Sequence, residues 1–196
     1  LREDRRHIKD KDLKKICNIR KIPVNLEISI NKKIVNFALK TKPNYICIVP
    51  EKRKEITTEG GLNLSKNKKE LKQIISKFKK KGIRTSLFIN PNINDIKKSI
   101  LLNADCVELH TGRISNKVKM RKVYKKDFKL IKKCSIYANK LGLEVHAGHG
   151  LDYKTTKILS KIPEICEFNI GHFLIGESVF YSLDKVIKKF KKIIEG

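Results

Sequence analysis

The sequence has no long apolar run, and no uninterrupted stretch approaches the ~18 residues that a membrane-spanning helix requires. It also contains no C-x-x-C pair, and its five cysteines are odd in number. These features give no sign of a disulfide framework or a cysteine-rich metal site. Cys47, Cys106 and Cys166 lie in apolar, strand-like segments, so we expect them to be small buried side chains in a reducing cytoplasm.

Acidic side chains are few beside basic ones: 20 Asp and Glu stand against 46 Lys and Arg, and the formal net charge is +26. A nucleic-acid-binding protein would use such a surplus to neutralise phosphates. Arginine, the better side chain for forked recognition of phosphates and bases, is scarce, and no basic stretch alternates with aromatic residues. We therefore favour a solvated, lysine-rich surface without a specific nucleic-acid partner, and keep nucleic-acid binding as the alternative.

The sequence does contain a regular alternation of strand-like and helix-like segments. Predicted strands span 24–30, 45–50, 84–90, 106–112, 143–148 and 166–170. Predicted helices span 31–40, 71–81, a segment starting near 94, 128–141, 155–161 and 183–194, with Asn31 and Asn94 as N-cap residues. This alternation indicates an α/β fold in which helices cover a parallel sheet.

Strand polarity separates a doubly wound sheet of six strands from a TIM (β/α)8 barrel. Polar residues recur on one face of several strands, as with Glu27 and Glu108, and buried carboxylates are costly unless a polar site uses them. We therefore predict a TIM barrel forming a single domain over 1–196. Since a barrel typically has about 250 residues and the sequence opens directly on a charged segment, we expect an N-terminally truncated barrel of about six complete strands plus the tail of one more.

Two glycine–histidine pairs follow the last two predicted strands. Gly148-His149-Gly150 ends one strand, and Gly171-His172 ends the next. In TIM barrels the loops after strands seven and eight, together with the start of a short extra helix, often bind phosphate. Glycines let backbone N–H groups approach the anion, and the helix end adds partial positive charge. Ordinary glycine turns carrying two incidental histidines are the alternative.

Three further features could take part in catalysis or ligand binding. The segment 50–62 is long for a connection between a strand and a helix, and its charges and Gly60-Gly61 pair indicate a lid, or else a solvated loop. Glu27, Glu108 and His149 could transfer protons in carbonyl condensation, or else be satisfied core residues. His146 and His149 have an H-x-x-H spacing, but no third ligand has a suitable spacing, and we predict no metal site.

The chain resembles the pyridoxine 5′-phosphate synthase family from end to end. Five stretches carry the resemblance, in order: Leu1 to Ile8; Pro50 to Arg53 with Thr57 to Leu62; Glu108 to Gly112; Ala147 to Leu151; and Asn169 to His172. It implies a TIM barrel with extra helices, assembly into a homo-octamer, and no cofactor. The implied reaction condenses 1-deoxy-D-xylulose 5-phosphate with 3-amino-2-oxopropyl phosphate, giving pyridoxine 5′-phosphate, inorganic phosphate and water. Another barrel enzyme acting on a sugar phosphate is the alternative within this class.

The resemblance also implies roles for individual residues. Glu27 would accept a proton, Glu108 would stabilise a transition state, and His149 would donate a proton. The deoxyxylulose phosphate would be bound by Arg2, His7 and Thr57, and the amine substrate by Gly150, Gly171 and His172. The family's first strand with its Asn-x-Asp-His motif, a following arginine and a histidine just before the position of Leu1 have no counterpart in these 196 residues. A molecule limited to these residues would have an open sheet edge, and we expect it to be inactive and poorly stable.

Overall fold

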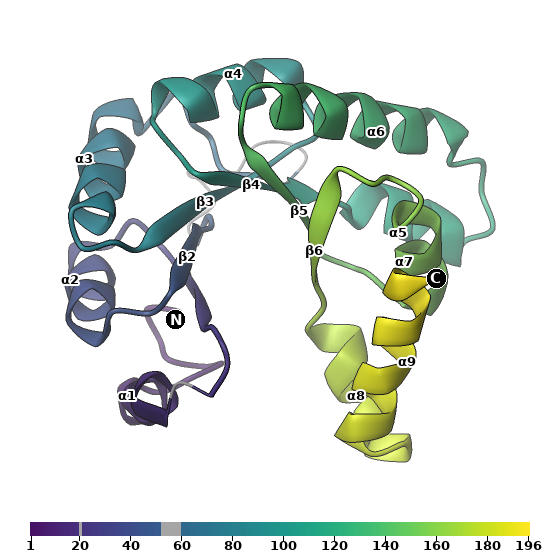
Figure 1. Ribbon diagram of the computed structural model, residues 1–196, viewed down its shortest axis with the longest axis horizontal. Helices are drawn as coiled ribbons and strands as arrows, with labels where there is room; N and C mark the ends of the chain where they lie inside the picture. Colours follow the sequence, from purple (N-terminus) through teal and green to yellow (C-terminus); the bar gives the residue numbers. More distant parts are fainter. Residues whose placement is uncertain (20, 52–59) are drawn as a thin grey trace. The chain divides into compact units, whose positions relative to one another are not determined.

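Parallel strands alternate with helices along the whole chain, as the sequence predicts. The computed structural model describes residues 1–19, 21–51 and 60–196 (Figure 1). The strands follow one another in sequence order, β1-β2-β3-β4-β5-β6. The chain divides into two compact units, Leu1–Glu108 and Leu109–Gly196, and the division falls inside strand β4 (Cys106–His110).

The first unit is built on three parallel strands whose helices lie along one side (Figure 1). β1 pairs with β2 and β2 with β3, so that Leu26 is opposite Ile46 and Ile46 is opposite Thr85. Its core holds fully buried Ile46, Ile75 and Phe78. The elements are α1 (Asp10–Ile19), β1 (Asn25–Ile28), α2 (Lys32–Thr41), β2 (Tyr45–Ile48), α3 (Lys68–Lys79), β3 (Arg84–Ile89) and α4 (Ile93–Leu101).

The second unit places β5 beside β6 in parallel and packs its last helices together. Tyr153 of α7, Phe173 of α8 and Phe190 of α9 form an aromatic cluster, with ring centroids 4.6–6.0 Å apart. Asp127, almost fully buried at the start of α6, forms ion pairs with Lys117 of α5 and with Arg113. The elements are α5 (Gly112–Lys119), α6 (Lys125–Lys140), β5 (Glu144–Gly148), α7 (Tyr153–Leu159), β6 (Ile165–Asn169), α8 (His172–Phe180) and α9 (Leu183–Glu195).

Helix starts follow capping chemistry, and one predicted cap is wrong. The Asn31 side chain accepts a hydrogen bond from Lys33 N at the start of α2, as predicted. For α4 the cap is Asn92 and not Asn94: Asn92 has extended backbone angles and its side chain accepts from Asn94 N at 2.7 Å. A capping residue precedes the first helical residue, and Asn94 already lies inside the first turn.

Two other predictions need correction. The predicted strand 106–112 ends at His110, because Gly112 begins α5, which the sequence analysis did not anticipate. Cys166 is exposed and not buried, because it lies on the exposed side of β6. Ile165 is the one buried residue of this strand. Its thiol lies 3.4 Å from Val145 O.

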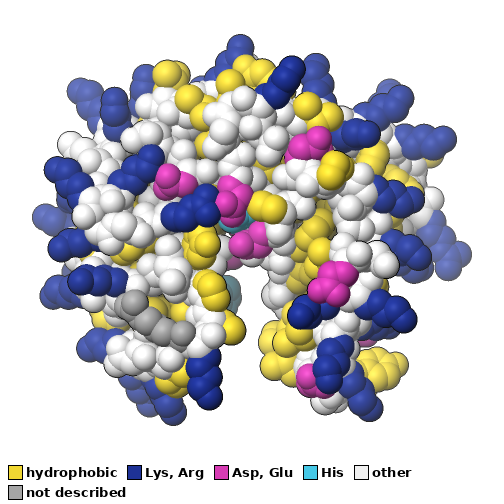
Figure 2. All heavy atoms as spheres, viewed as in Figure 1, with side chains coloured by type: hydrophobic (Ala, Val, Ile, Leu, Met, Phe, Trp, Pro, Cys, Tyr) yellow, Lys and Arg dark blue, Asp and Glu magenta, His cyan; other side chains and the backbone are white. Residues whose placement is uncertain are grey.

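Basic side chains lie on helices of both units and are not confined to one element. Figure 2 shows Lys and Arg side chains on the helices of both units. Within the described ranges, no helix has the length and apolar character needed to cross a membrane.

Candidate functional site

A row of side chains crosses the first unit at one level of its strands. Glu27 of β1 is paired with Cys47 of β2, and Cys47 with Ser86 of β3. Paired residues of neighbouring parallel strands project to the same face of the sheet. Glu108, in the part of β4 that belongs to this unit, joins the row because its Oε2 lies 3.3 Å from Cys47 Sγ.

The two carboxylates of this row have different environments. Cys47 and Glu108 are 0% and 3% exposed. Burial raises the pKa of the Cys47 thiol well above its usual value, and the charges of Glu108 and Glu27 raise it further. The thiol therefore stays protonated at neutral pH and donates its S–H to the Glu108 carboxylate. Glu27 is exposed, so one face carries a desolvated carboxylate and a solvated one.

The first residues of the chain lie across the carboxyl ends of β1 and β2. The Leu1 amino group donates to the Glu27 carbonyl oxygen. Arg2 Nη1 donates to Pro50 O at 3.0 Å, and Glu3 N donates to Glu51 Oε1 at 2.8 Å. Beside this segment, a surface depression is lined by Glu3, Arg5, Asn31, Lys32, Lys33, Ile34 and Asn36. His7 is exposed.

The predicted lid is described only at its two ends. Residues 52–59, Thr57 among them, lie outside the described residues. At the far end, Gly61 N donates to Asn90 Oδ1 at 3.0 Å and Leu62 N donates to Phe88 O at 2.8 Å. A side chain at Gly61 would lie 2.5 Å from Asn90 N. The end of the predicted lid is thus docked closely on the end of β3.

In the second unit, both glycine–histidine turns begin at the same edge of the sheet. β5 and β6 are parallel with Gly148 paired to Asn169, so each turn follows directly on a strand end. His149 (φ 78°) and Gly150 (φ 77°) have left-handed backbone conformations. After β6, α8 begins at His172 with Gly171 as its N-cap residue. The first amides of this helix have no partner within the helix itself.

The His149 imidazole is stacked on that of His110. The ring centroids are 4.8 Å apart and the planes differ by 24°. Burial lowers the pKa of His110 to about 4, with a further contribution from His149, so His110 is neutral at neutral pH. A side chain at Gly112 would lie 2.8 Å from His110 Cε1 and 2.9 Å from His149 Cδ2. The stacked pair therefore requires glycine at 112.

Comparison with known proteins identifies the family. The model of the family described as "Pyridoxal phosphate biosynthesis protein PdxJ" matches residues 1–196. A pyridoxine 5′-phosphate synthase from Pelagibacter ubique is 69% identical over 193 residues, covering 98% of this chain and 81% of that protein. The chain belongs to the pyridoxine 5′-phosphate synthase family. A member from Caulobacter vibrioides is 42% identical over 200 residues, covering 100% of this chain and 79% of its own length.

Solved structures of more distant proteins support the fold of this family member. N-(5′-phosphoribosyl)anthranilate isomerase from Pyrococcus furiosus matches with a TM-score of 0.63 at 16% identity, covering 99% of this chain and 84% of its own. 3-Keto-L-gulonate-6-phosphate decarboxylase from Vibrio cholerae matches with a TM-score of 0.59 at 11% identity, covering 94% and 79%. Both are TIM-barrel enzymes, so the chain has the predicted fold class.

Within each unit, the structure brings together several of the residues that sequence analysis selected for this family. In the first unit, Glu27 and Glu108 belong to one row of side chains, and Arg2 lies where β2 ends. In the second unit, the residues selected on the two turns, His149, Gly150, Gly171 and His172, follow paired strands. Their roles remain predictions, as does that of Thr57.

The sequence analysis missed three residues that contact these groups. Cys47 was interpreted only as a small buried side chain, yet it donates to Glu108. His110 was placed within the predicted strand 106–112, without its stacking on His149. Thr111, whose hydroxyl lies 2.7 Å from His149 O, was assigned no role. Each of these residues lies far along the chain from the group that it contacts, Cys47 from Glu108 and both His110 and Thr111 from His149, so residue spacing carried no signal for these contacts.

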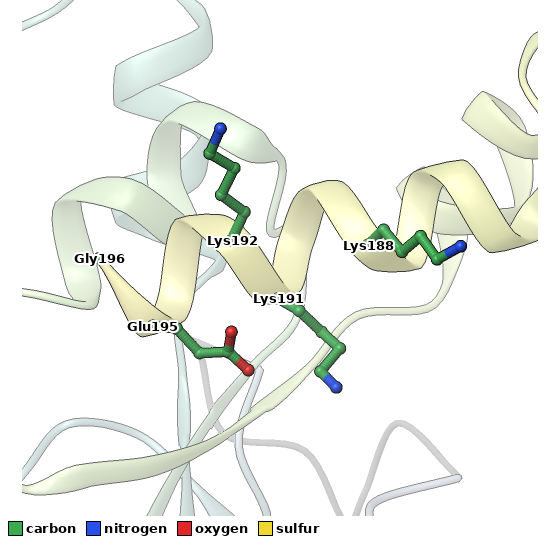
Figure 3. Close-up of a pocket in the computed structure, with 5 residues that line it drawn as sticks. All are labelled: Lys188, Lys191, Lys192, Glu195 and Gly196. Atoms are coloured by element: carbon green, nitrogen blue, oxygen red, sulfur yellow. The ribbon is translucent and has the colours of Figure 1, made fainter.

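A basic surface on α9 is not a second site. Lys188, Lys191, Lys192 and Glu195 line a shallow depression together with Gly196. Figure 3 shows that these side chains leave a single helix in different directions. Groups that do not converge on a common point cannot fix the orientation of a ligand.

Proposed function

We propose that the protein containing these residues condenses 1-deoxy-D-xylulose 5-phosphate with 3-amino-2-oxopropyl phosphate to give pyridoxine 5′-phosphate, inorganic phosphate and water. One observation carries the proposal beyond family membership. Two glycine–histidine turns follow neighbouring parallel strands at the same sheet edge, and a helix starts at the second turn. This arrangement suits an anionic ester, because backbone amides and a helix N-terminus favour negative charge.

The amine substrate's phosphate would bind at Gly150, Gly171 and His172. A side chain added at Gly171 would meet nothing within 4 Å, so the space in front of its Cα is open to a ligand. Gly150 has a positive φ, which turns the chain sharply after β5. His172, exposed in the first turn of α8, adds a side-chain donor at the helix end.

The deoxyxylulose phosphate would be held by Arg2, His7 and Thr57. Arg2 already lies at the end of β2, where its guanidinium donates to Pro50 O. A guanidinium can bind a phosphate through two parallel hydrogen bonds. The neighbouring depression also presents Lys32 and Lys33, together with Glu3 and with Arg5, which forms an ion pair with Asp10.

Proton transfer would be divided among three groups. Glu27, exposed and solvated, would accept the proton that must leave the condensing carbon or nitrogen. Glu108, buried and accepting a hydrogen bond from the protonated Cys47 thiol, would stabilise a transition state. His149, exposed at the end of β5, would donate a proton to the departing oxygen. Condensation and elimination move protons without net oxidation, so we propose no cofactor.

The decisive experiment compares the protein with its Glu27→Gln variant. Glutamine keeps the size of the side chain but cannot accept the proton, so we expect kcat to fall by about 100-fold or more. Binding of inorganic phosphate, measured by calorimetry, should change by less than about threefold because the phosphate contacts lie elsewhere. Glu70→Gln, on the exposed first turn of α3, is the matched control and should behave as the parent protein.

Formation of pyridoxine 5′-phosphate and release of phosphate from the two named substrates are the readouts. Normal turnover by Glu27→Gln would exclude the assigned proton acceptor. Absence of turnover by the parent protein, with turnover of another sugar phosphate, would favour a different barrel enzyme. Retention on nucleic acid that falls steeply with salt and depends on sequence would favour the nucleic-acid alternative.

Assembly and location complete the proposal. We propose a homo-octamer, supported by α8, where Ile175, Val179 and Phe180 are 61%, 80% and 81% exposed and would be covered by another subunit. Light scattering of the purified protein tests the assembly.

A cytoplasmic location is supported by five cysteines that are all free thiols. We propose one domain over 1–196, because the division between the two units falls inside β4 and not in a linker.

A further inference from the structure

The turn that carries His149 has an unfavourable backbone conformation. His149 and Gly150 follow one another with φ values of 78° and 77°. Glycine adopts this region freely, but a residue with a side chain does so at a cost. Such conformations persist where surrounding contacts impose them, and they are concentrated at functional sites.

Thr111 supplies hydrogen bonds to two successive carbonyl groups of this turn. Its backbone N–H donates to Gly148 O at 2.8 Å. Its hydroxyl lies 2.8 Å from Gly148 O and 2.7 Å from His149 O. Since the N–H already serves Gly148, the single hydroxyl hydrogen is available for the His149 carbonyl. Thr111 is fully buried, so water does not compete for these bonds.

The position of Thr111 in the fold makes this use of its hydroxyl informative. Thr111 is the N-cap residue of α5, where a threonine hydroxyl commonly accepts a hydrogen bond from its own helix. Here the side chain makes no such capping bond. The hydroxyl donates to the His149 turn, and the start of α5 loses a cap that the sequence could have provided.

The residues on either side of Thr111 fix the ring of His149. His110 stacks on the imidazole with centroids 4.8 Å apart. Gly112 leaves the space that the two rings occupy, because a Cβ there would approach both to within 2.9 Å. Three consecutive residues thus determine the backbone, the ring plane and the ring position of His149.

We propose that Thr111 is a positioning residue that holds His149 in its left-handed conformation for proton donation. The inference rests on the proposed function in one respect, the catalytic role of His149. The positioning itself is a structural statement and can be measured in the absence of substrate.

Thr111→Val removes the hydroxyl while keeping the shape of the side chain. We expect kcat to fall by about 10- to 100-fold, because small misplacements of reacting groups have effects of this size. KM for both substrates should change by less than about threefold, because the phosphate contacts are untouched. Thr111→Ser keeps the donor and should restore kcat to within about threefold of the parent value.

Thr156→Val is the matched control. Thr156 is also a fully buried threonine of the second unit, and its hydroxyl has no hydrogen-bond partner among the described residues. Its replacement should leave kcat unchanged. Comparable losses in Thr111→Val and Thr156→Val would show a general effect of buried threonines and would overturn the proposal.

Nuclear magnetic resonance of protein with ¹⁵N-labelled histidine separates positioning from catalysis. Thr111→Val should shift the His149 amide and ring signals, and Thr111→Ser should return them toward the parent positions. Unchanged His149 signals in Thr111→Val would overturn the proposal whether or not the protein turns over the named substrates. If Thr111→Val does not fold, Thr111→Ser and Thr111→Ala decide: parent-like signals and kcat in Thr111→Ala would overturn it equally.

Shifted His149 signals in Thr111→Val, combined with normal turnover by His149→Ala, would affect only one of the two claims. This result would retain Thr111 as the residue that positions the turn and exclude His149 as the proton donor of the proposed function. Failure of the positioning role of Thr111 and failure of the proton-donor role of His149 therefore give different results.

Discussion

Replacing Gly61 with alanine tests whether the chain before α3 is docked on the end of β3. The added methyl carbon would lie 2.5 Å from Asn90 N, 2.8 Å from the Ile89 carbonyl carbon and 2.9 Å from Asn90 Oδ1. Two of these atoms belong to the backbone, so rotation of a side chain cannot relieve the overlap. Overpacking of this kind costs about 1–3 kcal/mol.

A lost hydrogen bond adds to that cost. Moving Gly61 away would break the buried bond from its N–H to Asn90 Oδ1, at 3.0 Å, which contributes about 1 kcal/mol. We therefore expect Gly61→Ala to lower the free energy of unfolding by about 2–4 kcal/mol.

Urea unfolding followed by circular dichroism measures this difference. Gly176→Ala is the control, since a Cβ at this helical position meets nothing within 4 Å, and helix propensity predicts a gain of up to about 1 kcal/mol. A Gly61→Ala protein as stable as its parent would refute the docking. Equal losses in both variants would refute close approach as the cause.

Two further predictions concern protonation and thiol access. The pKa of His110 is lowered from 6.5 to about 4, so the stability due to its neutral ring is complete above pH 6.5 and is lost as pH falls toward 4. Measured by urea unfolding across this range, the free energy of unfolding should depend more steeply on pH in the parent than in His110→Gln. The difference in slope should be less than about 1.4 kcal/mol per pH unit, because the ring is partly exposed. Equal slopes would contradict the burial of this ring. Ellman's reagent should modify one thiol of the native protein, the exposed Cys166, and all five after denaturation. Partial burial raises the pKa of the Cys166 thiol, so it should react more slowly than a free cysteine. Reaction of several thiols in the native protein would contradict the buried positions of the other four.

Much of the fold could be predicted because local patterns and tertiary structure agree. Alternating apolar residues in 24–30 give β1, and Asn31 caps the helix that follows it. Gly82 and Gly142 end their helices with positive φ, as glycine does at helix ends. The two glycine–histidine turns could be placed at one sheet edge because consecutive parallel strands end on the same side.

What could not be predicted depends on contacts between distant residues. α1 buries only Leu13 and Cys17, one turn apart, which is too weak a pattern to identify a helix. The hydrogen bond between Thr111 and the His149 turn joins residues far apart in sequence, so no local pattern reveals it. The exposure of Cys166 depends on which side of β6 is covered, and an apolar segment alone does not reveal this.

The choice of a thiol at position 47 has a consequence for the charge of the sheet face in the first unit. An ammonium or guanidinium group there would form an ion pair with Glu108 and neutralise it. The protonated sulfur offers only a weak hydrogen bond, so it orients the carboxyl group of Glu108 without placing an opposite charge beside it. Because Cys47 is completely enclosed, solvent oxidants do not reach its sulfur, and its hydrogen bond to Glu108 is protected from oxidation of the thiol.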